Sequence, residues 1–454
     1  MKNQDKEELF ERMPVPNAVA KLAIPTVIAC MVMVLYNLAD TFFVGKINDP
    51  IETGAVTLAA PVILAFNAVT NLFGTGCSSM MSRCLGKKDY EGVRQSAAIG
   101  FYGAIIAGLI FSLSATIFRP GLLNLLGADS ESFSRTAAYM FWTVSLGSIP
   151  SMLNVVMSNL VRAEGSSLHA SVGTMSGCIL NVILDPFFIM PWGLGMGAAG
   201  AGLATFISNL VATGYYLVYI YTKRNETYVS INPKDFLNAN KRIVGSIFYV
   251  GVPASIQNIL NVIGMTIMNN FMAGYNIHAV SAMGITHKVG MVPMYAAMGI
   301  AQGILPLVGY NFASGNRKRM KDTVRFTEKI AGAFMIIAAA TFFILSSEII
   351  GIFMKDALVV EYGGAFLKGM ALGTPFLFFD FLAVGIFQAC GMGKESLIFA
   401  ILRKVALEIP AMFVLDKLFP MYGLAYAQLV AEFVLSIIAC IILEKIINKQ
   451  DEEK

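Results

Sequence analysis

Long apolar stretches alternate with short polar turns along almost the whole chain. Twelve of these stretches reach about twenty residues or more, the length that an α-helix needs to cross a bilayer. The pattern predicts an all-α polytopic membrane protein with twelve transmembrane helices. The predicted helices cover residues 18–44, 54–82, 96–117, 136–161, 168–190, 198–221, 243–272, 279–312, 327–346, 365–390, 396–416 and 422–443.

One connection is much longer than the others and divides the predicted helices into two sets of six. It covers residues 222–242 and is rich in lysine, arginine and asparagine. We therefore expect an N-terminal lobe of helices 1–6 at residues 1–221, a cytoplasmic linker at 222–242 and a C-terminal lobe of helices 7–12 at 243–454.

The two predicted lobes resemble each other in sequence. Four matches occur in the same order in both halves, as expected for a duplicated unit with small changes in loop length. Six helices per unit is an even number, so both units share one orientation and are related by a pseudo-two-fold axis along the membrane normal, as in many transporters. The matches pair residues 74–88 with 303–317, 39–45 with 268–274, 160–165 with 386–391 and 202–210 with 423–431.

Charged residues are scarce, and their placement predicts the orientation of the chain. Only 14% of the residues are charged, whereas a soluble chain carries about a quarter, so a sizeable soluble domain is excluded. With a cytoplasmic N-terminus, 26 of the 33 lysines and arginines fall in cytoplasmic segments and 6 on the other side, with Arg403 and Lys404 counted as cytoplasmic. We expect a multi-pass protein of the inner (plasma) membrane. By the positive-inside rule, both of its termini are expected on the cytoplasmic side.

Motifs for nucleotide or enzyme chemistry are weak. The stretch GMGKES (391–396) lacks the serine or threonine that follows the lysine of a phosphate-binding loop. The three histidines, His169, His278 and His287, are dispersed and predict no metal cluster. We expect no enzyme activity and no cofactor, so transport would be driven by an ion gradient or run downhill.

We place six ionisable residues of the predicted helices at bilayer depth, where charge is costly and marks functional positions. We interpret Lys288 as the only base at mid-membrane depth, which needs an acidic partner such as Asp380 or Glu408. The six residues are Asp40, Asp185, Lys288, Asp380, Glu408 and Glu432.

Asn181 and Asp185 lie four residues apart, and hence on one face of the fifth predicted helix. Pro186 removes a backbone donor and can free a carbonyl nearby. Such oxygen ligands suit a proton or Na+. If the first, fifth and sixth helices pack together, Asp40 and Thr205 join this pocket. Two close carboxylates cannot both ionise comfortably there, so one is expected to hold a proton. The alternative is a buried hydrogen-bonded pair that holds helices together.

Other polar residues in the apolar helices are candidates for a substrate site or a secondary charge site. Asn154 corresponds to Asp380 in the repeat, although amides in membrane helices more often serve packing. These candidates are Tyr36, Asn37, Asn154, Gln257, Lys288 and Asp380.

Several short motifs occur along the chain: Pro25 with NLADTFFVG (37–45), LGKKD (85–89), RAEG (162–165), LNVILDP (180–186), GLAT (202–205) and QACGMG (388–393). Taken together, these motifs resemble those of multidrug and toxic compound extrusion (MATE) transporters, most closely the DinF-like and MepA-like prokaryotic branch. The resemblance implies efflux of organic, often cationic, compounds in exchange for H+ or Na+ by alternating access, with no further cofactor.

The resemblance also implies positions for the ion site. In DinF-like relatives, a proton or cation site in the N-terminal lobe corresponds here to Asp40, Asn181, Asp185 and Thr205. Another branch uses an acid in the seventh helix and an aspartate in the tenth. This chain keeps Asp380 but has Gln257 where that acid is expected, so a C-terminal ion site is in doubt.

Two other functions fit the sequence less well. A flippase for lipid-linked saccharides, from the same superfamily, needs a markedly basic cavity, and Lys288 alone offers little. An integral-membrane enzyme needs clustered polar groups near one interface, which the sequence lacks. The expected partners are small organic molecules and the lipid bilayer, without nucleic acid, and the chain is expected to act as a monomer.

Overall fold

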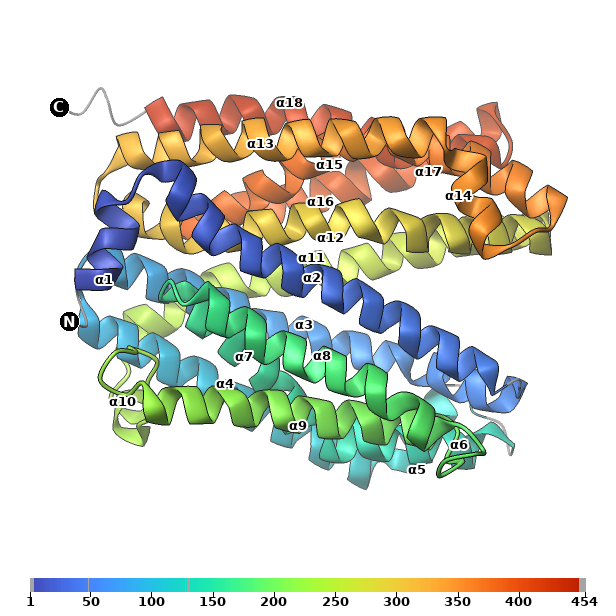
Figure 1. Ribbon diagram of the computed structural model, residues 1–454, viewed down its shortest axis with the longest axis horizontal. Coiled ribbons are helices and arrows are strands. Elements are labelled where there is room, and N and C mark those ends of the chain that lie inside the picture. The colour runs from blue at the N-terminus through green and yellow to red at the C-terminus, as the bar shows by residue number, and fades with distance from the viewer. Residues whose placement is uncertain (1–3, 48, 127, 129–130, 449–454) are drawn as a thin grey trace.

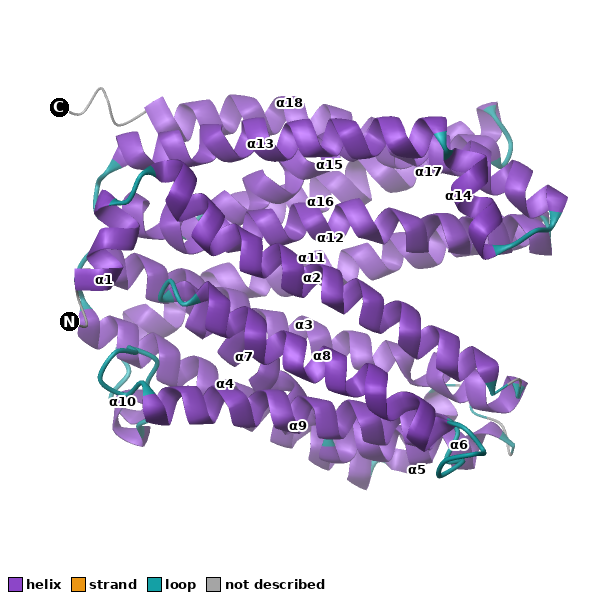
Figure 2. Ribbon diagram, viewed as in Figure 1, coloured by secondary structure: helices purple, strands orange, loops and turns teal. Residues whose placement is uncertain are grey.

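The computed structural model describes residues 4–47, 49–126, 128 and 131–448 (Figure 1). Within these ranges the regular structure is entirely helical, as Figure 2 shows, which confirms the predicted all-α class. The helices are α1 Gln4–Glu7, η1 Glu8–Arg12, α2 Val15–Lys46, α3 Pro50–Gly86, α4 Tyr90–Ile117, α5 Arg119–Leu125, α6 Ser132–Met140, η2 Phe141–Leu146, α7 Ser148–Ala163, α8 Ser167–Ile189, α9 Ala198–Thr222, α10 Pro233–Leu237, α11 Lys241–Tyr275, α12 Ile277–Ala313, α13 Arg317–Ile344, α14 Ser346–Phe353, α15 Ala357–Cys390, α16 Gly393–Ile401, η3 Leu402–Glu408, α17 Ile409–Leu418, η4 Tyr422–Tyr426 and α18 Ala427–Asn448.

The described helices supply ten spans that are long and apolar enough to cross a membrane. An eleventh is formed by the pair 132–146 and 148–163, which bends by 50° at its break. The predicted span 396–416 falls on α16, η3 and α17, which follow one another without a gap and include a seven-residue π-helix. None of these three helices is long enough by itself to cross a membrane. The total of twelve membrane spans therefore stays a prediction.

The helices gather in two halves that lie side by side in Figure 1. We call α2–α9 the N-terminal half and α11–α18 the C-terminal half. Helices α2 and α11 make the main connections between them, because α2 packs along α12 and α11 packs along α3. Helix α1 and the C-terminal end of α18 lie at the same end of the molecule (Figure 1). The exact lobe boundaries and the pseudo-two-fold axis stay predictions.

The two halves meet closely at the end of the molecule that holds α1 and the C-terminal end of α18, which we call the closed end. A Cβ atom on Gly76 of α3 would lie 2.5 Å from the carbonyl oxygen of Ile247 on α11. A Cβ atom on Gly303 of α12 would lie 2.6 Å from the Cα of Ala23 on α2. Small residues let membrane helices pack backbone to backbone, so these two glycines set how tightly the halves meet.

The linker between the halves is an ordered part of the closed end. Its Tyr228 and Val229 are buried, and the carbonyl oxygen of Ile231 accepts a hydrogen bond of 2.9 Å from the hydroxyl of Tyr102 on α4. Gln95 of α4 donates its amide to the carbonyl oxygen of Asn238 at 3.3 Å. The linker is therefore held against the N-terminal half by side chains of α4.

One matched pair of the sequence repeat adopts the same backbone conformation. Gly165 after α7 and Gly391 after α15 both have positive φ angles, 91° and 77°. Glycine adopts this left-handed region readily because it has no Cβ. The helices that precede the two glycines therefore end in a similar way at equivalent repeat positions.

Candidate functional site

Two adjoining cavities lie between and within the halves. The larger has a volume of about 1020 Å³ and is lined mainly by the C-terminal half, and the smaller has about 550 Å³ and is lined mainly by the N-terminal half. Their walls share residues of α2, α3, α12 and α15, which makes the two cavities neighbours across these helices. The shared residues are Asn37, Asp40, Asn71, Thr75, Tyr295, Met298, Gln302, Leu305 and Gln388.

The Asn-xxx-Asp pair of α8 forms a hydrogen-bonded unit with α9. With the Asn181 amide nitrogen facing the carboxylate, it donates to Asp185 Oδ2 at 2.9 Å, and the amide oxygen accepts from the backbone N–H of Thr205 at 3.1 Å. Asn181 and Asp185 are buried, with 1% and 0% exposure. Pro186 has no N–H to offer the carbonyl of Val182, one turn earlier in the helix. The predicted i, i+4 pair therefore lies on the face of α8 that meets α9.

Helix α2 completes this cluster. Tyr36 and Asp40, one turn apart on α2, line the smaller cavity together with Asn181, Thr205 and Tyr139 of α6. Asp185 follows Asn181 by one turn of α8 and lies within electrostatic reach of Asp40. Helices α2, α8 and α9 pack against one another. The structure thus brings together the four residues of the predicted ion site, with Tyr36 and Tyr139 beside them.

The two carboxylates of this cluster have no basic partner. Among the described residues, neither Asp40 nor Asp185 forms an ion pair. Asp185 accepts a hydrogen bond from the Asn181 amide, a neutral donor that leaves the negative charge of the carboxylate uncompensated. A carboxylate buried without a counter-ion binds a proton or a cation readily, because the added positive charge removes the cost of burial.

The other candidates of the N-terminal half line the cavities as local polar contacts. Asn154 donates its amide to Asn209 Oδ1 at 2.8 Å and so joins α7 to α9. Asn37 donates to the carbonyl oxygen of Met33 at 2.8 Å, which is a contact within one helix turn. Both line the smaller cavity.

The C-terminal half pairs its buried acids with bases. Arg403 of η3 lies between Asp380 of α15 and Glu432 of α18, at 3.2 Å and 2.5 Å. The next residue, Lys404, pairs with Glu408 at 2.6 Å. Asp380 and Glu432 are both 0% exposed. This cluster therefore holds three carboxylates and two cations in the interior of the C-terminal half.

Two sequence-based interpretations were wrong in this region. Lys288 is not the only base at membrane depth, because Arg403 and Lys404 lie inside the η3 segment and pair with buried acids. Lys288 also pairs with neither of its expected partners, since Asp380 is taken by Arg403 and Glu408 by Lys404. The i, i+4 spacing of Lys404 and Glu408 was a sequence signal for their ion pair. It was overlooked because Arg403 and Lys404 were counted as cytoplasmic residues.

The remaining C-terminal candidates face the larger cavity. Gln257 of α11 and Lys288 of α12 both line it, and Lys288 is exposed there. Gln257 accepts a hydrogen bond of 3.4 Å from the Gln388 amide of α15. Asp380 is fully buried behind Arg403 and does not line the cavity. The structure therefore separates Asp380 from Gln257 and Lys288.

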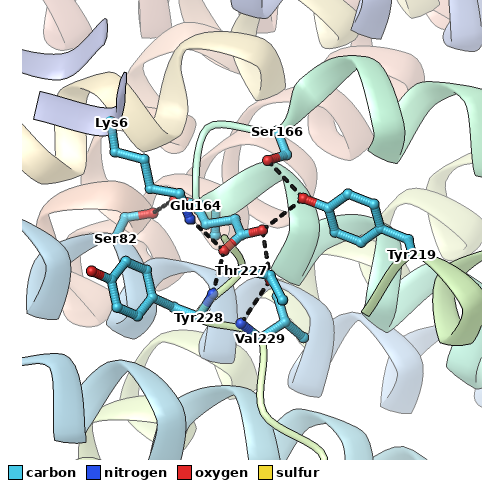
Figure 3. Close-up of polar contacts among 9 residues, drawn as sticks. Lys6, Ser82, Glu164, Ser166, Tyr219, Thr227, Tyr228 and Val229 are labelled. Carbon is cyan, nitrogen blue, oxygen red and sulfur yellow. Dashed lines mark hydrogen bonds and ion pairs between the residues drawn. The ribbon is translucent and has the colours of Figure 1, made fainter. Parts of the chain in front are cut away.

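The sequence analysis missed a polar hub at the closed end. Glu164 follows α7 and is 0% exposed, and its carboxylate accepts four hydrogen bonds (Figure 3). The donors are the Lys6 ammonium at 2.6 Å, the Tyr219 hydroxyl at 3.0 Å, the Thr227 hydroxyl at 2.8 Å and the backbone N–H of Tyr228 at 2.7 Å. Glu164 therefore joins the N-terminus, α9 and the linker.

Residues 4–12, which we call the N-terminal arm, reach across the closed end to the other half. Phe10 stacks on Tyr310 of α12 with ring centroids 4.7 Å apart. Arg319 of α13 donates to the carbonyl oxygen of Phe10 at 2.6 Å, and Tyr310 donates to Glu11 at 2.6 Å. Leu9 and Phe10, set among charged residues, were the only sequence signal for this docking.

The arm also has an exposed ion pair with the N-terminal half. Lys88, after α3, donates to Glu7 at 3.0 Å. This hydrogen bond is the main cause of a raised pKa for the Lys88 ammonium, with the nearby Glu11 charge second. The arm is thus bonded to both halves, through Lys6 and Lys88 on one side and through Phe10 and Glu11 on the other.

A bundle of membrane-spanning helices with a large interior cavity and buried acids beside it has the architecture of a transporter. Comparison with known proteins gives the family. The chain belongs to the MatE family, whose model matches residues 25–187 and 253–414. It is therefore a multi-pass membrane transporter and not an enzyme.

Curated relatives match along nearly the whole chain. The multidrug export protein MepA of Staphylococcus aureus (strain MRSA252) is 31% identical over 435 residues, which cover 96% of this chain and 94% of MepA. MepA of Staphylococcus saprophyticus is 30% identical with the same coverage. These matches confirm the resemblance to MATE transporters that the motifs carried.

Solved structures share the fold. A multidrug resistance MATE family transporter in an outward-facing conformation superposes with a TM-score of 0.93 at 24% identity, and 100% of both chains are covered. A mutant of the Vibrio cholerae MATE transporter VcmN gives a TM-score of 0.89 at 18% identity, with 96% of this chain and 98% of that chain covered. At such identities the likeness shows the fold alone.

Proposed function

We propose that this protein exports organic, often cationic, compounds in exchange for H+ or Na+ by alternating access. The distribution of lysine and arginine supports a cytoplasmic location for both termini. The closed end, where α1 and the C-terminal end of α18 lie, is then the cytoplasmic end, and the large cavity opens toward the outside. This arrangement is the outward-open state of the cycle, in which exported compounds leave and coupling ions enter.

The observation that carries the proposal is the position of Asp40. Its side chain lines both the larger cavity and the smaller one. An ion that neutralises Asp40 removes the negative charge that a cationic compound meets in the larger cavity. Ion and compound therefore weaken each other's binding, and this coupling is reciprocal. Exchange follows when the transporter changes state with either one bound, but not both.

The conformational change would begin near this site. Helix α2 carries Pro25 and α8 carries Pro186, and each proline interrupts the hydrogen-bond ladder of its helix. Sharp kinks in helices occur mostly at such positions. Neutralising the carboxylates lets α2 and α8 repack, and bending at these prolines transmits the change to the contacts at the closed end.

The test is transport by the full chain in proteoliposomes. A fluorescent organic cation is loaded, and its efflux is followed under an imposed pH gradient or an imposed Na+ gradient. Wild type should transport under one of them, and Asp40→Asn should lose that gradient-driven transport while still binding the cation. Unchanged gradient-driven transport by Asp40→Asn contradicts the proposed coupling, and absence of cation transport by wild type contradicts the proposed function.

A further inference from the structure

Arg162 is a buried base that the proposed ion site leaves unused. It is the last residue but one of α7, is 8% exposed and lines the cavity of about 550 Å³. Among the described residues it forms no ion pair. Glu164, the acid nearest to it along the chain, pairs with the Lys6 ammonium instead. The wall of the smaller cavity therefore holds a guanidinium charge without an acidic partner.

The groups around Arg162 are neutral. Its two terminal nitrogens donate to Asn159 Oδ1 at 3.2 Å and to Ser158 Oγ at 3.3 Å, both within α7. The Cys30 thiol and the Tyr216 hydroxyl lie within electrostatic reach, and such groups are uncharged at neutral pH. The carbonyl end of a helix carries only roughly half an elementary charge. These neighbours therefore leave part of the guanidinium charge uncompensated.

The guanidinium also keeps donors free for a ligand. Its Nε is buried and has no hydrogen-bond partner among the described residues. A guanidinium has five N–H donors in one plane, and the bonds to Asn159 and Ser158 use two of them. A buried cation with unused donors is costly unless an anion or another acceptor meets it. The free edge of the Arg162 guanidinium is therefore suited to an anion.

The equivalent position in the other half shows that the fold itself does not need this charge. The repeat that pairs residues 160–165 with 386–391 places Gln388 where the N-terminal half has Arg162. Gln388 is a neutral amide, and its nitrogen donates to Ser396 Oγ at 3.3 Å. Both segments nevertheless turn at a glycine with positive φ. The charge of Arg162 is therefore not required to end its helix.

We propose that Arg162 binds a small monovalent anion, such as chloride, in the smaller cavity. The anion accepts charge-assisted hydrogen bonds from the free N–H groups of the guanidinium. One guanidinium neutralises one negative charge, so a divalent anion such as sulfate keeps an excess charge among neutral groups. Asp40 lines the same cavity, and its carboxylate also disfavours a second negative charge. The site is distinct from the Asp40 and Asp185 cluster, which takes positive ions.

The position of Arg162 predicts that the anion stabilises the N-terminal half. Helix α7 meets α3 at this point, because Ser82 of α3 donates to the carbonyl oxygen of Ala163 at 3.3 Å. A guanidinium paired with an anion removes the cost of burying an unpaired charge between these helices. A ligand that binds only the folded state raises its stability in a saturable way. Thermal unfolding is therefore a direct readout of the proposed site.

The test compares anions at constant ionic strength on the purified full chain in detergent. Potassium chloride replaces potassium gluconate, and thermal unfolding is followed. Wild type should gain stability in a saturable way with chloride and with bromide, and sulfate should give no such gain. Arg162→Gln, which copies the residue of the other half, should lose the chloride effect. Arg242→Gln, at an exposed arginine of α11, is the control and should keep it.

A second measurement keeps the test decisive if Arg162→Gln does not fold. The NMR line of chloride broadens while the ion exchanges with a protein site, and bromide should reverse this broadening in wild type by competition. Arg162→Lys keeps the charge but loses the planar set of donors. It should therefore bind chloride roughly tenfold more weakly than wild type. Equal affinity in both proteins would contradict binding by the guanidinium.

Other results would also overturn the inference. The absence of a saturable chloride effect on wild type in both measurements would show that Arg162 takes no free anion. A chloride effect that survives in folded Arg162→Gln, or that Arg242→Gln removes as well, would place the binding elsewhere. Equal stabilisation by sulfate would reject the monovalent class. Both measurements are made without transport, so none of these results decides the proposed export function.

Discussion

The N-terminal and C-terminal halves bury their acids in different ways. In the N-terminal half, Asp40 and Asp185 lie among amides and hydroxyls, and the described residues supply them with no ion pair. In the C-terminal half, Asp380 and Glu432 share Arg403, and Glu408 pairs with Lys404. Asp185, Asp380 and Glu432 are all fully buried, so for these three the difference lies in the counter-ions, whereas Asp40 is only half-buried and lines the cavities.

This difference separates two roles for a buried acid. A paired acid already has its positive charge, and its removal leaves the partner buried and unpaired. An unpaired acid gains its positive charge from solution, as a proton or a cation. The C-terminal cluster is therefore interpreted as structural, and the N-terminal cluster as the part that exchanges ions.

The largest effect should come from breaking the C-terminal cluster at its shared base. Arg403→Met leaves Asp380 and Glu432 without their counter-ion, which should destabilise the fold by about 3–5 kcal/mol. Thermal unfolding of the purified chain in detergent measures the loss. Adding Asp380→Asn and Glu432→Gln to Arg403→Met should restore much of the stability. A single variant as stable as wild type would show that this cluster does not depend on its ion pairs.

The next effect concerns transport and comes from Asp185→Asn in the other half. Removing an unpaired buried charge costs little stability, so thermal unfolding should change little. Gradient-driven efflux should fall by roughly 30-fold, which corresponds to about 2 kcal/mol. The exposed Asp322→Asn on α13 is the control and should transport as wild type. If Asp185→Asn strongly destabilised the fold and the folded fraction still transported normally, the N-terminal cluster would be structural and not the part that exchanges ions.

Glu164 sharpens the comparison because it is a buried acid of the N-terminal half that does have a basic partner, Lys6. Glu164→Gln weakens its bond to the Lys6 ammonium and should cost about 1.5 kcal/mol, as for a hydrogen bond to a charged group. The closed end should then open about tenfold more often. Energy transfer between dyes attached at Lys234→Cys and Lys318→Cys, in a chain without other cysteines, reports this opening.

The control for this prediction is Glu226→Gln. Glu226 is 62% exposed and pairs with Lys223, three residues away in the same segment. The substitution Glu226→Gln removes a glutamate charge near the same linker and leaves the contacts of Glu164 unchanged. Equal dye distances in wild type and Glu164→Gln would mean that the hub does not hold the closed end.

The smallest effect is expected for the exposed pair of Lys88 and Glu7. Lys88→Met should change the opening of the closed end by less than about twofold, since exposed pairs contribute little. The raised pKa of Lys88 means that the pair stabilises docking below the ordinary lysine value and loses this effect only as pH rises through the raised value. The same dye pair should therefore show no change attributable to Lys88 between pH 6 and 8, and about 1 M salt should abolish its contribution.

The sequence predicted the helical class and the N-terminal cluster because both have local signals. Apolar runs of bilayer length mark spans, and the i, i+4 spacing of Asn181 and Asp185 places both on one face of α8. The contact of α2, α8 and α9 is not local, and it came from the resemblance to MATE transporters. The coupling role of this cluster stays a prediction.

The partners in the C-terminal half could not be assigned from the sequence. Arg403 finds Asp380 and Glu432 on two other helices, and no spacing along the chain encodes that meeting. The count of lysines and arginines on each side of the membrane also concealed this pairing, because a base near the end of a predicted helix is readily assigned to the cytoplasm. In the π-helix η3 the side chains project in other directions than in a regular α-helix. A pattern with a period of 3.6 residues does not predict these directions.

The N-terminal arm has a consequence for the order in which the molecule is made. Its residues are synthesised well before α12 and α13, yet Phe10 and Glu11 contact Tyr310 and Arg319, which follow about 300 residues later along the chain. Until α12 and α13 are inserted, the arm is held by its contacts to the N-terminal half and the linker, which include Glu164, Lys88 and Tyr228. The seal of the closed end is therefore a late event of biogenesis, and bulky tags fused to the first residue should delay maturation more than tags at the last.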